Sequence, residues 1–465
     1  FALGVGLLAA GCARAPGGDD ASPAGAYDDD DDAGGAAGRA GASASGGRGG
    51  GGPAGSGGRG GSAGAGAGGG GAGGSGGGCT VRLVPERELL ITALPVVNDP
   101  VRTRWTGSSD DPSDGAWSFG RLMTNLAGDR DPEAFVRSWL SAFESDRVIN
   151  GFVVPARPAV SGLLLAPWPK LAGGRLDLTR APMRLLAVVN RLDLRNPAAG
   201  SAGEGRFVFG VLGPGGEPTE FTVILEYDLA AADAAEVRAW AERWHELGGL
   251  DPATAEYRQK LEAITERFAG RNAAPGRPNG SAINQVRTNE IALAAPWELR
   301  EFALSESGLL VETSLAQTPD FGFNGSFALA DFINANEHAM LGEAHFVPLQ
   351  QGGAPFRAGA VTNNIDFWFA PGVRSNDARH KFSLNTCNGC HGAETGTPFL
   401  HVFPREAGEE ARLSPFLTGM VMIDPVGGER RPFHDLERRA VSVTSALCAP
   451  STEAIDREVP SARAH

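Results

Sequence analysis

The chain has 465 residues, and its 55 acidic side chains outnumber 41 Lys and Arg to give a formal net charge of −14. This charge, with no basic stripe interleaved with aromatic residues, argues against a nucleic-acid-binding protein. Beyond residues 1–10, no stretch approaches the roughly 18 consecutive apolar residues of a membrane-spanning helix, so the mature chain is not expected to span a bilayer.

The start of the sequence is typical of a secretory signal peptide. Residues 1–10 are apolar or Gly and lead directly into Gly11 and Cys12. The run from Leu7 to Cys12 resembles the cleavage box of bacterial lipoproteins, and this resemblance makes Cys12 the lipidated first residue of the mature protein. An ordinary signal peptide with an incidental cysteine is the alternative. We therefore expect residues 1–12 to be a truncated lipoprotein signal peptide, and the protein to sit in the cell envelope, at the outer membrane or facing the periplasm, and to touch membrane only through its lipid.

Residues 13–78 consist mainly of Gly, Ala and Ser and contain almost no large apolar side chain. Such a segment cannot bury enough surface to offset its ordering entropy, so it predicts a disordered tether. The acidic run from Asp28 to Asp32 is interpreted as a solvated spacer, with calcium binding as a weaker alternative because no loop scaffold accompanies it.

The pattern after residue 78 predicts a folded α+β domain over residues 79–325. Apolar runs and alternating patterns predict strands at residues 88–97, 185–194, 206–212, 221–227, 285–293, 297–304 and 309–316. Apolar residues at helical spacing predict helices at residues 131–143, 233–247, 251–268 and 326–341. Because strands and helices occur in clusters and do not alternate strictly, we expect a mixed or antiparallel sheet with packed helices. A small, mainly helical region over 326–448 and a polar tail over 449–465 complete the expected organisation.

The segment from Cys387 to His391 reads Cys-Asn-Gly-Cys-His, the C-x-x-C-H signature of covalently attached haem c. Two intervening residues in a helical turn place both sulfurs on one edge of a porphyrin, and His391 then reaches the iron as its proximal ligand. A zinc site and a redox dithiol are the alternatives. Zinc needs a further ligand, such as Cys448 or His401, because no second C-x-x-C exists. A dithiol does not require a histidine after the second cysteine.

Residues 378–391 (ARHKFSLNTCNGCH) resemble c-type cytochrome domains, in which a short helix leads into the haem-binding turn. Residues 392–405 (GAETGTPFLHVFPR) resemble sequences of bacterial exported single-haem proteins of unassigned role. The resemblance covers a minor part of the chain and implies haem c and one-electron transfer. It also implies haem attachment outside the cytoplasm, in agreement with the export signal.

The sixth iron ligand decides the chemistry, and three residues are the main candidates: His401, Met420 and Met422. Methionine ligation raises the reduction potential and a second histidine lowers it, whereas an open position permits catalysis. Arginines suited to the haem propionates are Arg405 first, with Arg412 and Arg379 as further candidates. The other histidines considered are His380, as a surface or propionate-facing residue, and His338, His345 and His434 as weaker ligands.

Two cysteines of the five remain, Cys79 and Cys448, and we expect them to form a disulfide that closes the folded region. Because the region after His391 is short, the preceding domain should supply part of the haem pocket. The run Arg287-Thr288-Asn289-Glu290 is a candidate part of a polar cleft, without an identifiable catalytic partner.

The sequence thus predicts an exported single-haem c lipoprotein that transfers one electron at a time to a partner protein the sequence does not identify. The alternatives are a haem-dependent oxidoreductase whose large domain binds a substrate, and a surface binding module that carries a redox or zinc centre.

Overall fold

The structure, a computed structural model, describes residues 79, 81–108, 110–362 and 365–449. The expected signal peptide with Cys12, the tether at 13–78 and the tail beyond residue 449 lie outside these residues. Among the helices that are described, none is both long and apolar enough to span a bilayer.

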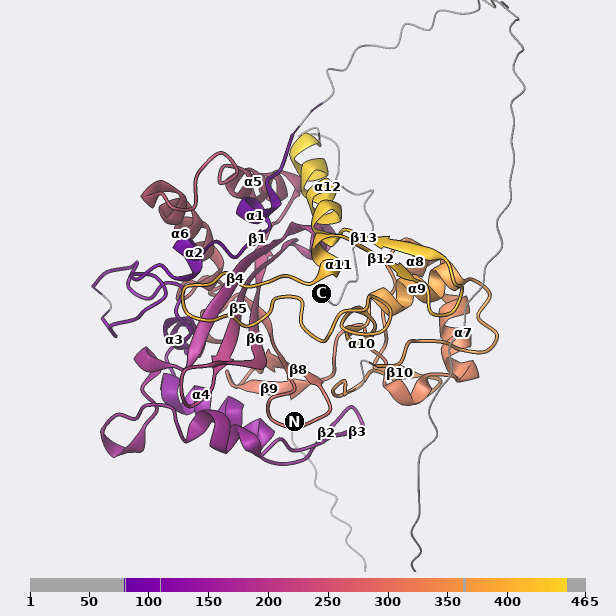
Figure 1. Cartoon of the computed structure of the whole chain (residues 1–465), viewed down its shortest axis with the longest axis horizontal. Coiled ribbons are helices and arrows are strands. Elements are labelled where there is room, and N and C mark those ends of the chain that lie inside the picture. The colour runs from indigo at the N-terminus through magenta and orange to yellow at the C-terminus, as the bar shows by residue number, and fades with distance from the viewer. Residues whose placement is uncertain (1–78, 80, 109, 363–364, 450–465) are drawn as a thin grey trace, which may run out of the picture. The chain divides into compact units, whose positions relative to one another are not determined.

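A seven-stranded sheet in the order β1-β4-β5-β6-β7-β8-β9 forms the centre of the domain (Figure 1). Its strands are Leu90–Ile91, Met183–Arg191, Ser201–Leu212, Pro218–Ala230, Ile283–Glu290, Glu298–Leu304 and Leu310–Thr313. Every neighbouring pair runs antiparallel. The α+β expectation is therefore confirmed, and the sheet is antiparallel throughout.

Helices cover one face of this sheet, and the part of the C-terminal segment around Cys390 and residues 402–433 covers the other, whereas the last helix packs into the helix-side core. The principal helices of the first layer are α3 (Phe119–Ala127), α4 (Pro132–Leu140), α5 (Ala234–His245) and α6 (Ala255–Ala269). Successive side chains of β5 point alternately toward the two layers. Phe207 and Phe209 enter the helix-side core, whereas Val208 packs with Cys390 on the opposite side. Covering on both faces explains why β5 is buried along almost its whole length.

Asp131 and Asp233 cap the helices predicted to begin at them, whereas the helix predicted from residue 251 begins at Ala255 and is capped by Thr254. Asp131 accepts a hydrogen bond from the Ala134 amide at 2.9 Å, and Pro132 occupies the first turn of α4. Asp233 caps α5 in the same way through the Glu236 amide, also at 2.9 Å.

Two predicted elements are wrong in part. Residues 88–97 form only the short strand β1, followed by helix α2 (Leu94–Val97), because Pro95 has no amide for a strand ladder and suits the first turn of a helix. The helix expected at 326–341 is broken at Asn336 into α7 (Phe327–Ala335) and α8 (Glu337–Leu341).

The region 326–448 contains helices and two small hairpins. Its further elements are β10 (Gln350–Gln351), β11 (Ala354–Pro355), α9 (Asn376–Leu384), α10 (Cys387–Cys390), α11 (Pro415–Thr418), β12 (Met420–Ile423), β13 (Arg430–Phe433) and α12 (Asp435–Cys448). The remaining regular elements of the domain are α1 (Pro85–Glu88), β2 (Arg147–Ile149), β3 (Phe152–Val154) and a π turn at Ser161–Leu165. Short 3-10 turns lie at Ser141–Phe143, Ala172–Gly174, Leu178–Arg180, Leu192–Leu194, Pro197–Ala199, Pro278–Gly280 and Phe321–Phe323.

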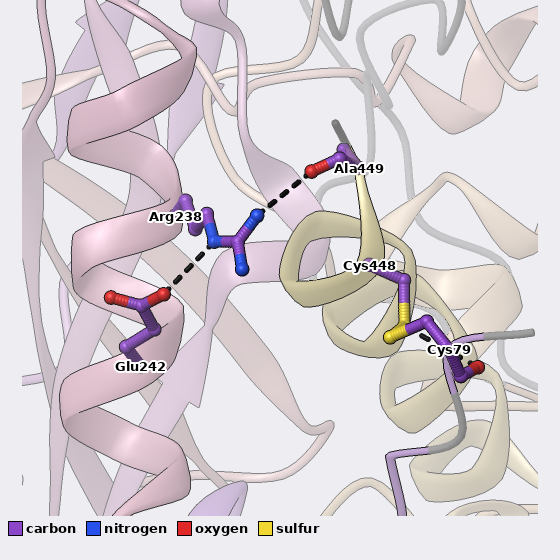
Figure 2. The surroundings of a disulfide bond; sticks show 5 residues. All are labelled: Cys79, Arg238, Glu242, Cys448 and Ala449. Atoms are coloured by element: carbon purple, nitrogen blue, oxygen red, sulfur yellow. Dashed lines mark hydrogen bonds and ion pairs between the residues drawn. A yellow bond between two sulfur atoms is a disulfide. The ribbon is translucent and has the colours of Figure 1, made fainter. Parts of the chain in front are cut away.

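A disulfide joins Cys79 to Cys448, whose Cα atoms lie 5.6 Å apart although 369 residues separate them. Figure 2 shows the bond at the end of α12, beside α5. Arg238 of α5 pairs with Glu242 at 2.9 Å and donates to the Ala449 carbonyl at 2.9 Å. The disulfide expected from the sequence is thus present in the structure, and it ties the start of the folded region to its last helix.

Candidate functional site

The C-x-x-C-H segment forms a single tight helical turn, α10. The Thr386 hydroxyl caps it by accepting the Gly389 amide at 3.1 Å, and His391 closes it by donating its amide to the Cys387 carbonyl at 2.9 Å. A glycine is required at 389, because an added Cβ would lie 2.1 Å from the Ser383 carbonyl oxygen. The spacing that predicts a helical turn is therefore realised in the backbone.

The two cysteine side chains of the turn are unoxidised and buried. Cys387 packs in an apolar cluster with Trp297 and Leu299, and Cys390 packs against the sheet beside Val208. Burial raises the pKa of both thiols. A catalytic dithiol needs a lowered pKa at its attacking cysteine, so this environment does not favour the dithiol alternative.

His391 is held in one tautomer by a backbone carbonyl. Its Nδ1 lies 2.8 Å from the Phe399 oxygen, which only accepts, so Nδ1 carries the proton and Nε2 is the basic nitrogen. Trp297 stacks on the imidazole with ring centroids 5.9 Å apart. Asn289 donates a hydrogen bond to the same Phe399 oxygen at 2.8 Å and so helps to fix that carbonyl. Burial lowers the pKa of His391 to about 4, which keeps the ring neutral, as a metal ligand must be.

His401 is the distal candidate that the fold brings to His391. Their ring centroids lie 4.3 Å apart, His401 Nδ1 lies 2.8 Å from the Ser414 hydroxyl, and its Nε2 lies 3.2 Å from Cys390 Sγ. Met420 and Met422 instead pack around Gly396, where an added Cβ would lie 2.8 Å from the Met422 methyl group.

A hollow of about 80 Å³ lies between these two histidines and the sheet. Its apolar wall includes Leu90, Val189, Val208, Ile224 and Leu299, from five different strands. The large domain therefore supplies most of one wall.

Charged residues of neighbouring strands line the same hollow. Glu226 of β6 lies between Arg206, at 3.1 Å, and Arg287, at 3.2 Å. Arg191 and Arg439 complete the basic lining and pair with Asp193 and Asp435 respectively. Arg287 and Asn289, noted in the sequence as part of a polar cleft, both border the hollow.

The arginines singled out for propionates lie elsewhere. Arg405 donates to the backbone carbonyls of Leu185, Val97 and Glu409 at 2.8–3.2 Å, so its guanidinium joins the C-terminal segment to the domain. Arg412 stacks over Phe403.

Of the other histidines, His338 and His434 are exposed, and His345 is buried. None of these three borders the hollow.

Arg379 and His380 belong to a buried ion-pair network that the sequence did not indicate. His380, Glu394 and Asp424 are the group within the described residues whose ligand atoms lie close enough together to hold a metal. Arg379, however, donates to Glu394 at 2.7 Å and to Asp424 at 2.9 Å, and Arg431 donates to Asp424 at 3.0 Å. Two guanidinium groups thus already balance the two carboxylates.

The zinc alternative finds no assembled ligand set in the described part of the chain. Cys387, Cys390, His391 and His401 do not bring three ligand atoms within 4.8 Å of one another. Cys448, the other candidate ligand, is in the disulfide.

No protein-family model, curated protein or solved structure matches this chain. Its function has to be inferred from the residues of the turn and of the hollow.

Proposed function

We propose that the protein carries one haem c, attached by thioethers to Cys387 and Cys390, and that it transfers single electrons at the cell envelope. The observation that carries this proposal is the state of His391. A neutral imidazole with its Nδ1 proton given to a backbone carbonyl and its ring fixed by Trp297 is the form in which histidine binds a metal through Nε2. A histidine that only filled space in the core would need no such fixed tautomer directly after a C-x-x-C turn.

The chemical types of the residues around the hollow match those that a haem needs. Strand side chains supply an apolar wall, and Arg206 and Arg287 border it in place of Arg405; each would have to exchange its ion pair with Glu226 for one with a propionate. The hollow is smaller than the roughly 300–1,000 Å³ of typical small-molecule sites, so a porphyrin requires residues 400–417 to move away from the sheet. A single β-bridge, between Val402 and Leu413, lies within that segment, and movement of the segment has to break the hydrogen bonds from Arg405 to the carbonyls of Leu185 and Val97.

We propose His401 as the second axial ligand in preference to Met420 and Met422. It already borders the hollow with His391, whereas the two methionines pack against the cluster around Cys390 without bordering the hollow. When bound, the haem iron supplies the one-electron couple, and two histidine ligands favour a low potential. The protein's own contribution is to fix His391, exclude water from its ring and balance the propionate charge.

A haem-dependent oxidoreductase is the second candidate, favoured by one observation. Glu226 is fully buried between two guanidinium groups in the same hollow, and burial raises its pKa, so an ionisable carboxyl group lies near the proposed iron site. Uptake of carbon monoxide by the reduced protein separates the two functions, because an iron with two histidine ligands does not bind it without losing one.

The covalent attachment is tested by expression in a host that matures c-type haem. Cys387→Ser with Cys390→Ser should abolish haem staining on a denaturing gel, whereas the matched pair Cys79→Ser with Cys448→Ser should retain it. Persistent staining in the first variant would show that the haem, if any, is attached elsewhere. Visible spectra of the oxidised and reduced wild type then report the axial ligands.

Export and lipidation belong to the same proposal. The lipoprotein-like sequence at Cys12 would anchor the protein in the membrane, and a redox partner protein in the envelope, not a nucleic acid, would exchange electrons with it. In a full-length preparation, Cys12→Ser should move the protein from the membrane fraction to the soluble fraction. Unchanged partitioning would rule out Cys12 as the anchor.

A further inference from the structure

A second hollow, of about 400 Å³, lies between helices α5 and α6, the end of β6 and the loop at 270–281. It has no part in the site around His391. Trp240 and five alanines, among them Ala239 and Ala274, line it, and three arginines border it: Arg243, Arg267 and Arg277. This volume falls within the roughly 300–1,000 Å³ of small-molecule sites, which are typically apolar with a few placed polar groups.

Two of the arginines lie over one indole ring. The guanidinium carbons of Arg243 and Arg267 are 5.4 Å and 5.8 Å from the Trp240 ring centroid. Trp240 is itself fixed, because it is only 7% exposed and donates its Nε1 hydrogen to the Ala230 carbonyl at 3.0 Å. The two positive groups are thus held on a rigid support.

Within the described residues, neither Arg243 nor Arg267 forms a hydrogen bond or an ion pair. The two carboxylates that border the hollow are already engaged. Asp228 accepts from the Ser201 hydroxyl at 2.6 Å, and Glu236 accepts from the Ala232 amide at 2.6 Å.

Stacking on Trp240 and positions in the last turns of α5 and α6 explain why arginines are tolerated here, since helix C-termini favour cations. They do not explain two adjacent guanidinium groups without a carboxylate partner. Arg238 of the same helix, in contrast, pairs with Glu242. Burial and the nearby Arg267 lower the pKa of Arg243, and three glutamates, Glu242, Glu246 and Glu236, offset this lowering only in part.

We propose that this hollow binds a small organic anion, whose carboxylate or phosphate group lies between Arg243 and Arg267 and whose apolar part contacts Trp240 and the alanines. Guanidinium groups bind both oxyanions with two parallel hydrogen bonds, so the charged end is recognised by shared chemistry. The alanines give the apolar part its space.

Isothermal titration calorimetry of the full chain with inorganic phosphate, acetate and hexanoate tests the proposal at low ionic strength. Saturable binding is expected, and hexanoate should bind at least about tenfold more tightly than acetate because its methylene groups contact the apolar floor. The phosphate arm distinguishes a phosphate site from a carboxylate site. No saturable binding of any of the three probes would overturn the proposal.

Variants locate the site. Arg243→Gln with Arg267→Gln should weaken binding at least about tenfold, and Arg238→Gln, the matched charge change on α5, should leave it unchanged. Ala239→Leu fills part of the apolar lining of the hollow and should weaken the binding of hexanoate more than the binding of acetate. Arg267 is exposed, so Arg267→Gln alone serves if the double variant does not fold. Equal losses in Arg238→Gln and in the Arg243 and Arg267 variants would place the binding elsewhere and refute the proposal.

Discussion

Replacing Glu312 by glutamine should reduce a fall in stability that the wild type shows between pH 5 and pH 8. Glu312 ends a buried row of charges on the helix-covered face of the sheet. Arg157 lies between Glu290, at 3.1 Å, and Glu298, at 3.2 Å, and Arg300 lies between Glu298, at 2.7 Å, and Glu312, at 3.4 Å. Three carboxylates therefore share two guanidinium groups, and the fully ionised row carries one uncompensated negative charge in the core.

Burial raises the pKa of both Glu290 and Glu312 to about 7 from 4.5. The native state thus retains a proton that the unfolded chain releases, so the stabilisation is complete below pH 4.5 and is lost as the pH rises to about 7. A shift of 2.5 pKa units, 7 minus 4.5, corresponds to about 3.5 kcal/mol for Glu312 at about 1.4 kcal/mol per unit. Burial raises the pKa of Glu290 separately, so Glu290 adds its own loss of stability over the same pH range.

In Glu312→Gln, the contribution of Glu312 is removed, whereas burial still raises the pKa of Glu290. The free energy of unfolding, measured by urea denaturation at constant salt with the disulfide intact, should then fall by about 2 to 3 kcal/mol less than in the wild type between pH 5 and pH 8. Glu306→Gln removes an exposed charge from the same β8–β9 hairpin and should keep the wild-type slope. Parallel pH profiles for wild type and Glu312→Gln would refute the reasoning.

Three further predictions concern the site and its support. Cys79→Ser with Cys448→Ser should lower the free energy of unfolding, measured by urea denaturation, by at most about 6 kcal/mol. This is the chain-entropy limit for a loop of 369 residues. No change would mean that the bond does not constrain the unfolded chain. Gly389→Ala forces a Cβ against the Ser383 carbonyl and should reduce the yield of haem-stained protein, and a wild-type yield would contradict the close packing of α10. His401→Ala should open the sixth position, so that the reduced protein gains carbon monoxide binding in its visible spectrum; an unchanged spectrum would exclude His401 as the ligand.

Local patterns in the sequence predict most of the sheet. The alternation that places Phe207 and Phe209 on one side of β5 and Val208 on the other is already present in the residue order. The pattern fails where one residue overrides it, as at Pro95, whose missing amide ends β1 and favours a helix.

The site could be predicted only where it is contiguous in the sequence. Cys387, Cys390 and His391 are neighbours, and their spacing carries its own chemistry. The role of Arg405 could not be predicted in this way. Its hydrogen-bond acceptors at Leu185 and Val97 are 220 and 308 residues away, and no local sequence pattern indicates them. Arg206 and Arg287 likewise come together at the hollow only once β5, β6 and β7 have paired.

The order in which the cysteines are synthesised affects how the disulfide between Cys79 and Cys448 forms. Synthesis from the N-terminus exposes Cys79 first, then Cys387 and Cys390, and only then Cys448. An external disulfide oxidant first forms a mixed disulfide with one cysteine, and the thiolate of an accessible second cysteine then attacks it and releases the oxidant as a thiol. Cys448, the native partner, is the last of these three cysteines to become available to Cys79. Correct pairing is favoured when the two middle thiols are already buried or modified as Cys448 arrives. A chain that oxidises too early has to reshuffle its bonds over seconds to hours, during which α12 cannot complete the core.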